Sequence, residues 1–205
     1  MKIIGINGSP RVGKTTSFAL GKALEAAAAV APRVETELIE IGKLSFHFCT
    51  GCNSCSGTGV CAIKDDFTEL LPKLIDPSVA GVIVGTPVYM GTMTGLCKDF
   101  LDRCVVIRRS NFAWTNVVGA VLAVGAARNG GQELTIQAVQ AALMVQNMVI
   151  VSDGPTYSHY GATLWSRCPG GIEKDELGLE IAHALGSRVA QLALKLHPEA
   201  PAPGR

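Results

Sequence analysis

The sequence predicts an α/β protein in which a doubly wound, five-stranded parallel sheet is covered by helices on both faces. Strand-like and helix-like segments alternate along the chain, and most strand-like segments are continuous apolar runs, as in parallel strands that are buried on both faces. The composition agrees, with 48% hydrophobic, 17% charged and 5% aromatic residues and with 23 glycines among 205 residues. Such values indicate a large core filled by small side chains, which is typical of layered α/β proteins.

Five strand-like segments are expected. They span Lys2–Asn7, Val34–Ile41, Val79–Gly85, Val117–Val124 and Met148–Ser152. The helical pattern predicts helices over Gly13–Val30, Phe67–Ile75, Thr94–Arg108, Gln132–Gln146 and Glu173–His197. Strict βα alternation favours parallel strands joined by right-handed crossovers. We expect one domain over residues 1–197 and a flexible tail over 198–205.

The longest interval between strands lies after the second strand and contains a cysteine-rich insertion, residues 47–63. A second stretch, Asp153–Ile172, shows no regular pattern and is expected to be irregular. Because the carboxyl ends of parallel strands share one edge of a sheet, the insertion should lie at the edge where open α/β sheets bind their ligands.

Charge and hydropathy exclude two classes of partner. The formal net charge is +1, from 18 basic and 17 acidic residues, with no charge run long enough for a nucleic-acid-binding arm. The longest apolar run, Val117–Ala127, is interrupted by glycines and is about half as long as the roughly 20 residues that span a membrane. The first residues turn polar by Asn7, too early for a signal peptide. We therefore expect a cytoplasmic protein without nucleic-acid or membrane partners, whose seven cysteines are thiols or metal ligands.

A glycine-rich loop follows the first strand and opens the first helix. It reads Gly8-Ser9-Pro10-Arg11-Val12-Gly13-Lys14-Thr15. Backbone N–H groups at a helix N-terminus bind anions, so this loop predicts a phosphate site. Its letters also match the triphosphatase pattern G-x-x-x-x-G-K-[ST]. A P-loop ATPase needs a strand that ends in a magnesium-binding carboxylate, but the third and fourth strands lead into Thr86-Pro87 and Gly125. An ATPase is kept as the third hypothesis.

Three loops together resemble one known family. Gly8-Ser9-Pro10-Arg11 is followed by Thr86-Pro87-Val88-Tyr89-Met90-Gly91 with Leu101-Asp102-Arg103, and then by the loop from Gly125 to Glu133. In this order the loops resemble those of the NADPH-dependent FMN reductase family over most of Lys2–Val151. The resemblance implies a flavodoxin-like fold and bound FMN. The sequence departs from the family near Lys14, where an Asn is more common.

The resemblance also implies which residues bind FMN. The phosphate would be held by the first loop, through Ser9, Arg11, Lys14, Thr15 and Thr16. The isoalloxazine would be lined by Pro87, Val88, Tyr89, Met90 and Gly91, and its other rim would be approached by Gly125, Arg128 and Gly130. Because the flavin carries the redox chemistry, no catalytic side chain is assigned.

The insertion contains four cysteines in the pattern C-x2-C-x2-C-x5-C, formed by Cys49, Cys52, Cys55 and Cys61. Thiolates at such short steps, on a loop with several glycines, are typical of an iron–sulfur cluster. The spacing resembles the compact motif of the iron–sulfur flavoprotein branch of the same family, which implies a [4Fe–4S] cluster. Structural zinc and empty thiols remain alternatives, although zinc knuckles usually have two well-separated C-x-x-C pairs.

The leading hypothesis is an FMN-dependent oxidoreductase, an iron–sulfur flavoprotein that relays electrons between a two-electron donor, such as NAD(P)H, and one-electron partners. The partner would be a small molecule or a ferredoxin-like protein. The alternative is an NAD(P)H-dependent FMN or quinone reductase without a cluster. The resemblance further implies a homodimer or homotetramer.

Several other residues have expected roles. Cys97 and Cys104 are expected to pack in the core, and His47 to form loop hydrogen bonds rather than to bind iron. The sequence further suggests a helix cap at Asp66 with Glu69, a solvated helix end at Arg108 and Arg109, and subunit contacts at Trp114 and Trp165.

Overall fold

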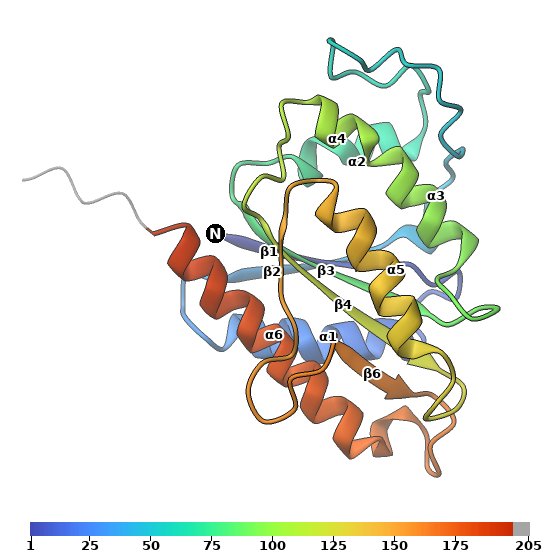
Figure 1. Cartoon of the computed structure of the whole chain (residues 1–205), viewed down its shortest axis with the longest axis vertical. Coiled ribbons are helices and arrows are strands. Elements are labelled where there is room, and N and C mark those ends of the chain that lie inside the picture. Colours follow the sequence, from blue (N-terminus) through green and yellow to red (C-terminus); the bar gives the residue numbers. More distant parts are fainter. Residues whose placement is uncertain (199–205) are drawn as a thin grey trace, which may run out of the picture.

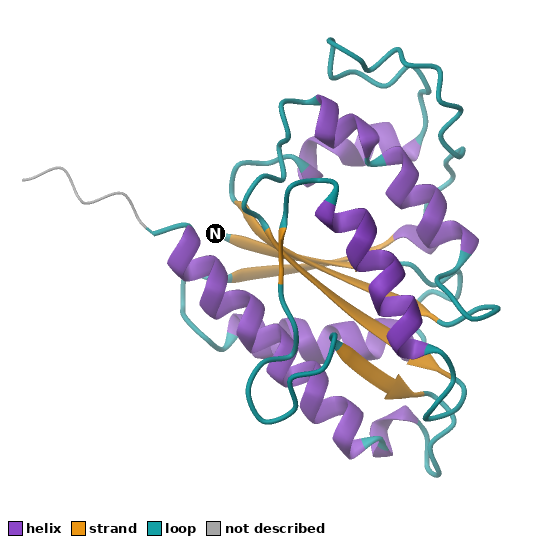
Figure 2. Ribbon diagram, in the orientation of Figure 1, coloured by secondary structure: helices purple, strands orange, loops and turns teal. Residues whose placement is uncertain are grey.

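The computed structural model describes residues 1–198, and six strands within this range form one parallel sheet (Figures 1 and 2). The strands are β1 (Lys2–Asn7), β2 (Glu35–Glu40), β3 (Val79–Pro87), β4 (Val118–Gly125), β5 (Val149–Ile150) and β6 (Ala162–Trp165). Their order is β2-β1-β3-β4-β5, with β6 also paired to β4. This is the doubly wound flavodoxin-like order, so the predicted fold class is confirmed.

The fifth strand position differs from the prediction. Instead of one strand over Met148–Ser152, the short β5 pairs with the start of β4, and β6 pairs with its end, from Leu122 to Gly125. The β6 segment comes from Asp153–Ile172, which was expected to be irregular, so that expectation is wrong in part. β6 alternates buried and half-buried residues over only four positions, which is too short a pattern to recognise in a sequence.

Helices cover both faces of the sheet, as predicted (Figure 1). One face carries α1 (Thr15–Ala28) and α6 (Glu176–Leu196), whose apolar residues pack against Ile3 and Ile83 in one core cluster. The other face carries α2 (Asp66–Leu74), α3 (Gly95–Arg103), α4 (Val105–Arg109) and α5 (Gln132–Met144). The 3-10 turns η1 (Ile41–Lys43) and η2 (Ile172–Lys174) complete the elements.

Two predicted helices are divided in the structure. The segment Thr94–Arg108 forms α3 and α4, which are separated at Cys104, and the last helix begins with η2 before α6. The predicted tail, 198–205, falls outside the described residues except for its first position. No helix within residues 1–198 is long and apolar enough to cross a membrane.

The two tryptophans lie elsewhere than expected. Trp114 is 1% exposed, and its indole nitrogen donates to the Leu74 carbonyl oxygen at 2.8 Å. It is a core residue, so the predicted subunit contact is wrong for Trp114. Trp165 at the end of β6 is half-buried and donates to the Ala126 carbonyl oxygen at 2.9 Å.

Candidate functional site

The loop between β1 and α1 is fixed by hydrogen bonds to the side chains of Asn7 and Glu40. Asn7 is fully buried; its Nδ2 donates to Glu40 Oε2 at 2.6 Å, and its Oδ1 accepts the Ser9 N–H at 3.0 Å. Glu40, the last residue of β2, also accepts hydrogen bonds from Ser17 Oγ and from the Gly13 N–H. The loop conformation is thus fixed by side chains that the sequence analysis did not identify.

The start of α1 suits an anion. Lys14 is the residue before its first turn and makes no side-chain capping bond, and no acidic residue lies in that turn. Gly13 has φ of +66° and open space beside its Cα. The first N–H groups of a helix have no partner within the helix, so here they can donate hydrogen bonds to a phosphate.

A cavity of about 220 Å³ brings this loop together with the chain segments at the carboxyl ends of β3, β4 and β6. It is lined by Ser9, Arg11, Lys14, Thr15, Thr16, Pro87, Val88, Tyr89, Val124, Ala126, Ser166 and Arg167. The predicted phosphate-loop residues therefore lie beside Tyr89, the aromatic residue of the second predicted loop. Basic and hydroxyl groups at one end and apolar side chains at the other match the two ends of FMN. Ser166 and Arg167 follow β6, so they were missed together with that strand.

The remaining predicted flavin residues do not line this cavity. Met90 is fully exposed, with φ of +50°, and forms with Gly91 the tip of the turn that pairs Tyr89 with Thr92. Arg128 forms an ion pair with the buried Asp175 and lies over the Trp165 ring, 5.7 Å from its centroid. The side chain therefore points toward α6.

The structure explains the glycines at positions 125 and 130 by the packing of their loop, which the sequence analysis did not foresee. A Cβ on Gly125 would come within 2.3 Å of Gln132 Nε2. Gln132 is buried and ties the β4–α5 loop together: Nε2 donates to the Ala127 carbonyl oxygen at 2.6 Å, and Oε1 accepts the Gly130 N–H at 2.7 Å. Both glycines allow this loop to fold tightly around the Gln132 side chain.

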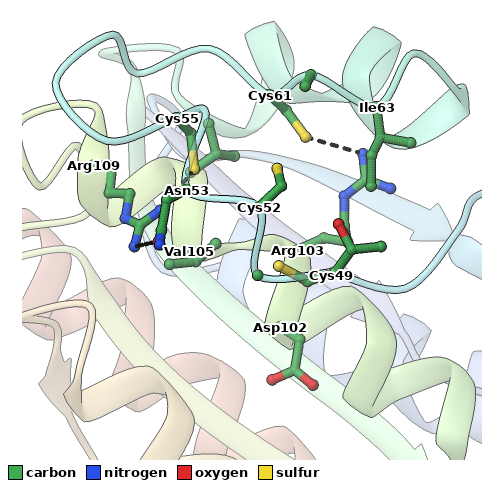
Figure 3. A pocket seen from close by; sticks show the side chains of 14 residues that line it. Cys49, Cys52, Asn53, Cys55, Cys61, Ile63, Asp102, Arg103, Val105 and Arg109 are labelled. Atoms are coloured by element: carbon green, nitrogen blue, oxygen red, sulfur yellow. Dashed lines mark hydrogen bonds between the residues drawn. The ribbon is translucent and has the colours of Figure 1, made fainter.

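The four motif cysteines lie in a second cavity, of about 310 Å³ (Figure 3). Cys49, Cys52, Cys55 and Cys61 surround the same space, together with residues of α3 and α4. The loop leaves the sheet after β2 at the expected edge, but it closes over α3 and α4 and not over the strand ends. Gly51, Gly57 and Gly59 have φ of +65°, +80° and +65°, which lets the chain turn sharply between the thiols.

One side of the cysteine cavity is formed by Arg103, which is 1% exposed. Its guanidinium binds Asp65 through two hydrogen bonds, of 2.6 and 2.9 Å, lies 4.6 Å from the Phe67 ring centroid and approaches Cys61 Sγ at 3.5 Å. Burial alone would raise the pKa of Asp65, but hydrogen bonds from Arg103 and from the His47 N–H lower that pKa to about 2. Asp65 is therefore ionised and pairs with the buried arginine.

The N-cap of α2 is Asp65 and not Asp66, so the predicted helix cap is wrong by one residue. The Asp65 side chain accepts the Thr68 N–H. Asp66 instead accepts the Ser45 N–H at 2.7 Å. His47 forms loop hydrogen bonds, as predicted, through its N–H to Asp65 and its Nδ1 to the Phe48 carbonyl oxygen.

The other side of the cysteine cavity is formed by Arg109. Its Nη1 lies 3.2 Å from Cys55 Sγ, and its Nη2 donates to Asn53 Oδ1 at 2.9 Å. The predicted solvated helix end is therefore wrong for Arg109. Arg108 is exposed and turns away, donating to the Val145 carbonyl oxygen at 2.7 Å.

The chemistry of the thiols separates two groups. Cys97 and Cys104 are fully buried; burial raises the pKa of Cys97 to about 12 and that of Cys104 well above its ordinary value, so both are protonated packing residues, as predicted. The pKa of the exposed Cys52 is instead lowered, first by its side-chain hydrogen bond with Ser54.

The donor set fits an iron–sulfur cluster, because four thiols lie around one cavity. In a [4Fe–4S] cluster each thiolate binds a different iron, so thiols spaced around a cavity suit it. Structural zinc also uses four thiolates, but all four sulfurs would have to lie about 2.3 Å from one point.

Comparisons with known proteins agree with this geometry. The family model described as NADPH-dependent FMN reductase matches residues 1–162. The chain belongs to this family. An iron–sulfur flavoprotein of Methanocaldococcus jannaschii is 40% identical over 192 residues, which cover 94% of this chain and 97% of that protein. Another, from Methanosarcina thermophila, is 39% identical over 180 residues and covers 88% of each chain. The predicted family and its iron–sulfur flavoprotein branch are confirmed.

Solved structures show the same fold at low identity. A flavone reductase superposes with a TM-score of 0.70 at 20% identity, over 94% of this chain and 63% of that one. A WrbA-like flavodoxin from Agrobacterium tumefaciens gives 0.60 at 19% identity, over 96% and 98% of the two chains. As a member of the family, the protein is an FMN-dependent oxidoreductase. The ATPase hypothesis is not supported, because β3, beside β1, ends in Thr86 and Pro87 without a carboxylate.

Proposed function

We propose that this protein carries both FMN and a [4Fe–4S] cluster and relays electrons between a two-electron donor and one-electron partners. The observation that carries the proposal is the gathering of Cys49, Cys52, Cys55 and Cys61 around one cavity. The relatives of similar length that are named iron–sulfur flavoproteins support it. FMN accepts electron pairs and an iron–sulfur cluster single electrons, so the two together convert one kind of transfer into the other.

The FMN phosphate would be bound by the β1–α1 loop. Arg11 and Lys14 supply positive charge, Ser9, Thr15 and Thr16 supply hydroxyl groups, and the N-terminus of α1 supplies N–H groups. Pro87, Val88 and Tyr89 would form the apolar wall against the isoalloxazine, with Met90 and Gly91 at its rim. The β4–α5 loop would contribute to FMN binding through its backbone shape, because it is folded around the Gln132 side chain. The loop residues with this indirect role would be Gly125, Arg128 and Gly130.

The two cavities are separate and are connected by α3. Thr94, at its N-terminus, donates to the Gly8 carbonyl oxygen of the phosphate loop at 2.5 Å, whereas Arg103, at its C-terminus, lines the cysteine cavity. A nine-residue helix is about 13 Å long, at 1.5 Å per residue. Loss of one cofactor should therefore leave the binding residues of the other intact.

The test is cofactor analysis of protein purified without oxygen. We expect flavin absorption, broad absorption near roughly 400 nm, and about four iron and four sulfide per chain. Cys52→Ala should lose iron and sulfide and keep FMN, and Cys168→Ala, which removes a thiol outside the motif, should keep all three. Flavin without iron in the unmodified protein would refute the cluster and leave an FMN or quinone reductase.

We further propose that NAD(P)H is the electron donor and that a small molecule or a ferredoxin-like protein is the acceptor, in a homodimer or homotetramer within the cytoplasm. The family description supports NADPH. All seven cysteines lie within the described residues and are free thiols, which suits a reducing compartment. Anaerobic NADPH oxidation with and without an added one-electron acceptor tests the donor, because a relay should turn over slowly until the acceptor is present.

A further inference from the structure

Two arginines approach two of the four cysteine thiols from opposite sides of the cavity (Figure 3). Arg109 Nη1 lies 3.2 Å from Cys55 Sγ, and Arg103 Nη2 lies 3.5 Å from Cys61 Sγ. Both distances are within the range of hydrogen bonds to sulfur. Cys55 is 7% exposed and Arg109 is half-buried, so their contact is partly shielded from water.

The two arginines differ in charge compensation. Arg103 is paired with Asp65 at 2.6 Å, so its positive charge is neutralised beside the cavity. The other partner of Arg109 is the neutral amide of Asn53, and no carboxylate in the described part of the chain forms an ion pair with it. Asp102 lines the cavity, but its carboxylate points away from the cysteines and binds Lys98 at 2.7 Å (Figure 3). Arg109 therefore brings an uncompensated positive charge to Cys55.

We propose that Arg109 sets the reduction potential of the cluster by hydrogen-bonding to Cys55, while Arg103 positions the cysteine loop. This inference rests on the proposed function, because it needs the cluster to be present. One-electron reduction adds negative charge to a cluster that four thiolates already make anionic. Hydrogen bonds to the sulfurs and nearby positive charge stabilise the reduced form more than the oxidised form, so Arg109 raises the potential.

The test is a redox titration of the anaerobically purified holoprotein, followed by cluster absorbance and by electron paramagnetic resonance. In Arg109→Gln we expect the equilibrium constant for cluster reduction to fall about tenfold, which corresponds to about 59 mV for one electron. Arg109→Lys keeps the charge and loses the planar hydrogen-bonding fork, so its shift should be smaller. The FMN couple serves as an internal reference and should stay unchanged.

Arg108→Gln is the matched control. Arg108 is the preceding residue of α4, but it contacts the Val145 carbonyl oxygen and the Phe112 ring outside the cavity. The Arg108→Gln variant should keep the cluster potential and the iron content of the wild type. A shift in both variants would mean that net surface charge, and not the contact with Cys55, is being measured, and would overturn the proposal.

Two further results would overturn it. Arg109→Gln with full iron content and an unchanged potential would show that the contact does not tune the cluster. Loss of iron from both Arg109 variants, with FMN retained, would show that Arg109 only supports the loop. Absence of iron from the wild-type protein would instead refute the proposed function, and this inference with it.

Discussion

Replacement of Asp65 by Asn tests the buried ion pair that attaches the cysteine loop to the helical layer. Asn and Asp are about equally good N-caps, so the cap of α2 is retained. The lost feature is the negative charge that faces Arg103, whose side chain is 1% exposed and whose Nε has no hydrogen-bond partner. Removing one member of a buried pair leaves an uncompensated charge, which costs about 3–5 kcal/mol.

Two features of the structure place the expected loss of stability for Asp65→Asn at the lower end of this range. The pKa of Asp65 falls from its ordinary value of 3.8 to about 2, which corresponds to about 2 kcal/mol of stabilisation of the ionised form. The Asn oxygen still accepts one bond from Arg103. We therefore expect a loss of about 3 kcal/mol, and a melting temperature lower by about 6–12 °C for a protein of this size.

Thermal and urea unfolding with parallel cofactor analysis measures this loss. Asp66→Asn is the matched control, because its half-exposed carboxylate accepts one bond from the Ser45 N–H, and it should cost less than about 1 kcal/mol. Adding Arg103→Met to Asp65→Asn removes the orphaned charge and should recover part of the loss. A loss below about 1 kcal/mol for Asp65→Asn, or purely additive effects in the double variant, would refute the reasoning.

Three further predictions concern the pH dependence of the Asp65 ion pair and the β1–α1 loop. The pKa of Asp65 is about 2 in the folded protein and 3.8 in the unfolded chain, so between these pH values the unfolded chain binds more protons than the folded protein. As the pH falls through this window, wild type should lose its stability advantage over Asp65→Asn, and above the window the advantage should be constant. Urea unfolding at a series of pH values measures this difference. Arg11→Gln should weaken FMN binding about tenfold by calorimetry and leave riboflavin binding unchanged, since the residue faces the phosphate end of the cavity; an equal loss for both ligands would contradict that placement. Gly8→Ala should cost about 1–3 kcal/mol and weaken FMN binding, because its Cβ would lie 2.7 Å from Cys97 Cβ, whereas Gly21→Ala in α1, with open space around it, should be neutral or stabilising.

The sequence was sufficient for the features that depend on local pattern. Buried parallel strands are continuous apolar runs, so β1, β3 and β4 were placed to within a few residues, and the loops at their carboxyl ends had to share one edge. The same reasoning selected the residues of the β1–α1 loop, and the spacing selected the four motif cysteines; each set lines one cavity, and their binding of FMN and of a cluster stays a prediction.

Contacts between residues far apart in the sequence could not be predicted from local patterns. Arg109 follows three apolar residues and another arginine, like an ordinary helix end, and only the packed loop shows that it contacts Cys55. Arg103 belongs to the segment that carried the family resemblance, yet in the structure it serves the cysteine loop through Asp65. Ser166 and Arg167 depend on β6, which forms because β4 extends beyond the two-residue β5 and offers a free edge to a second short strand.

The cysteine loop differs from the rest of the molecule in what holds it. Cys55 is the buried residue of the segment between Cys49 and Cys61, so the loop itself contributes little to the core. Its attachments are hydrogen bonds from α3 and α4, above all from Arg103, Arg109 and Ser110, which donates to the Gly59 carbonyl oxygen at 3.1 Å. In a loop with so few apolar contacts a bound cluster would add to stability, because the free energy of metal binding is then also folding free energy. Under the proposal above the two arginines have different parts: Arg103, paired with Asp65, would hold the loop in place before a cluster binds, and the hydrogen bond from Arg109 to Cys55 would then stabilise the reduced cluster.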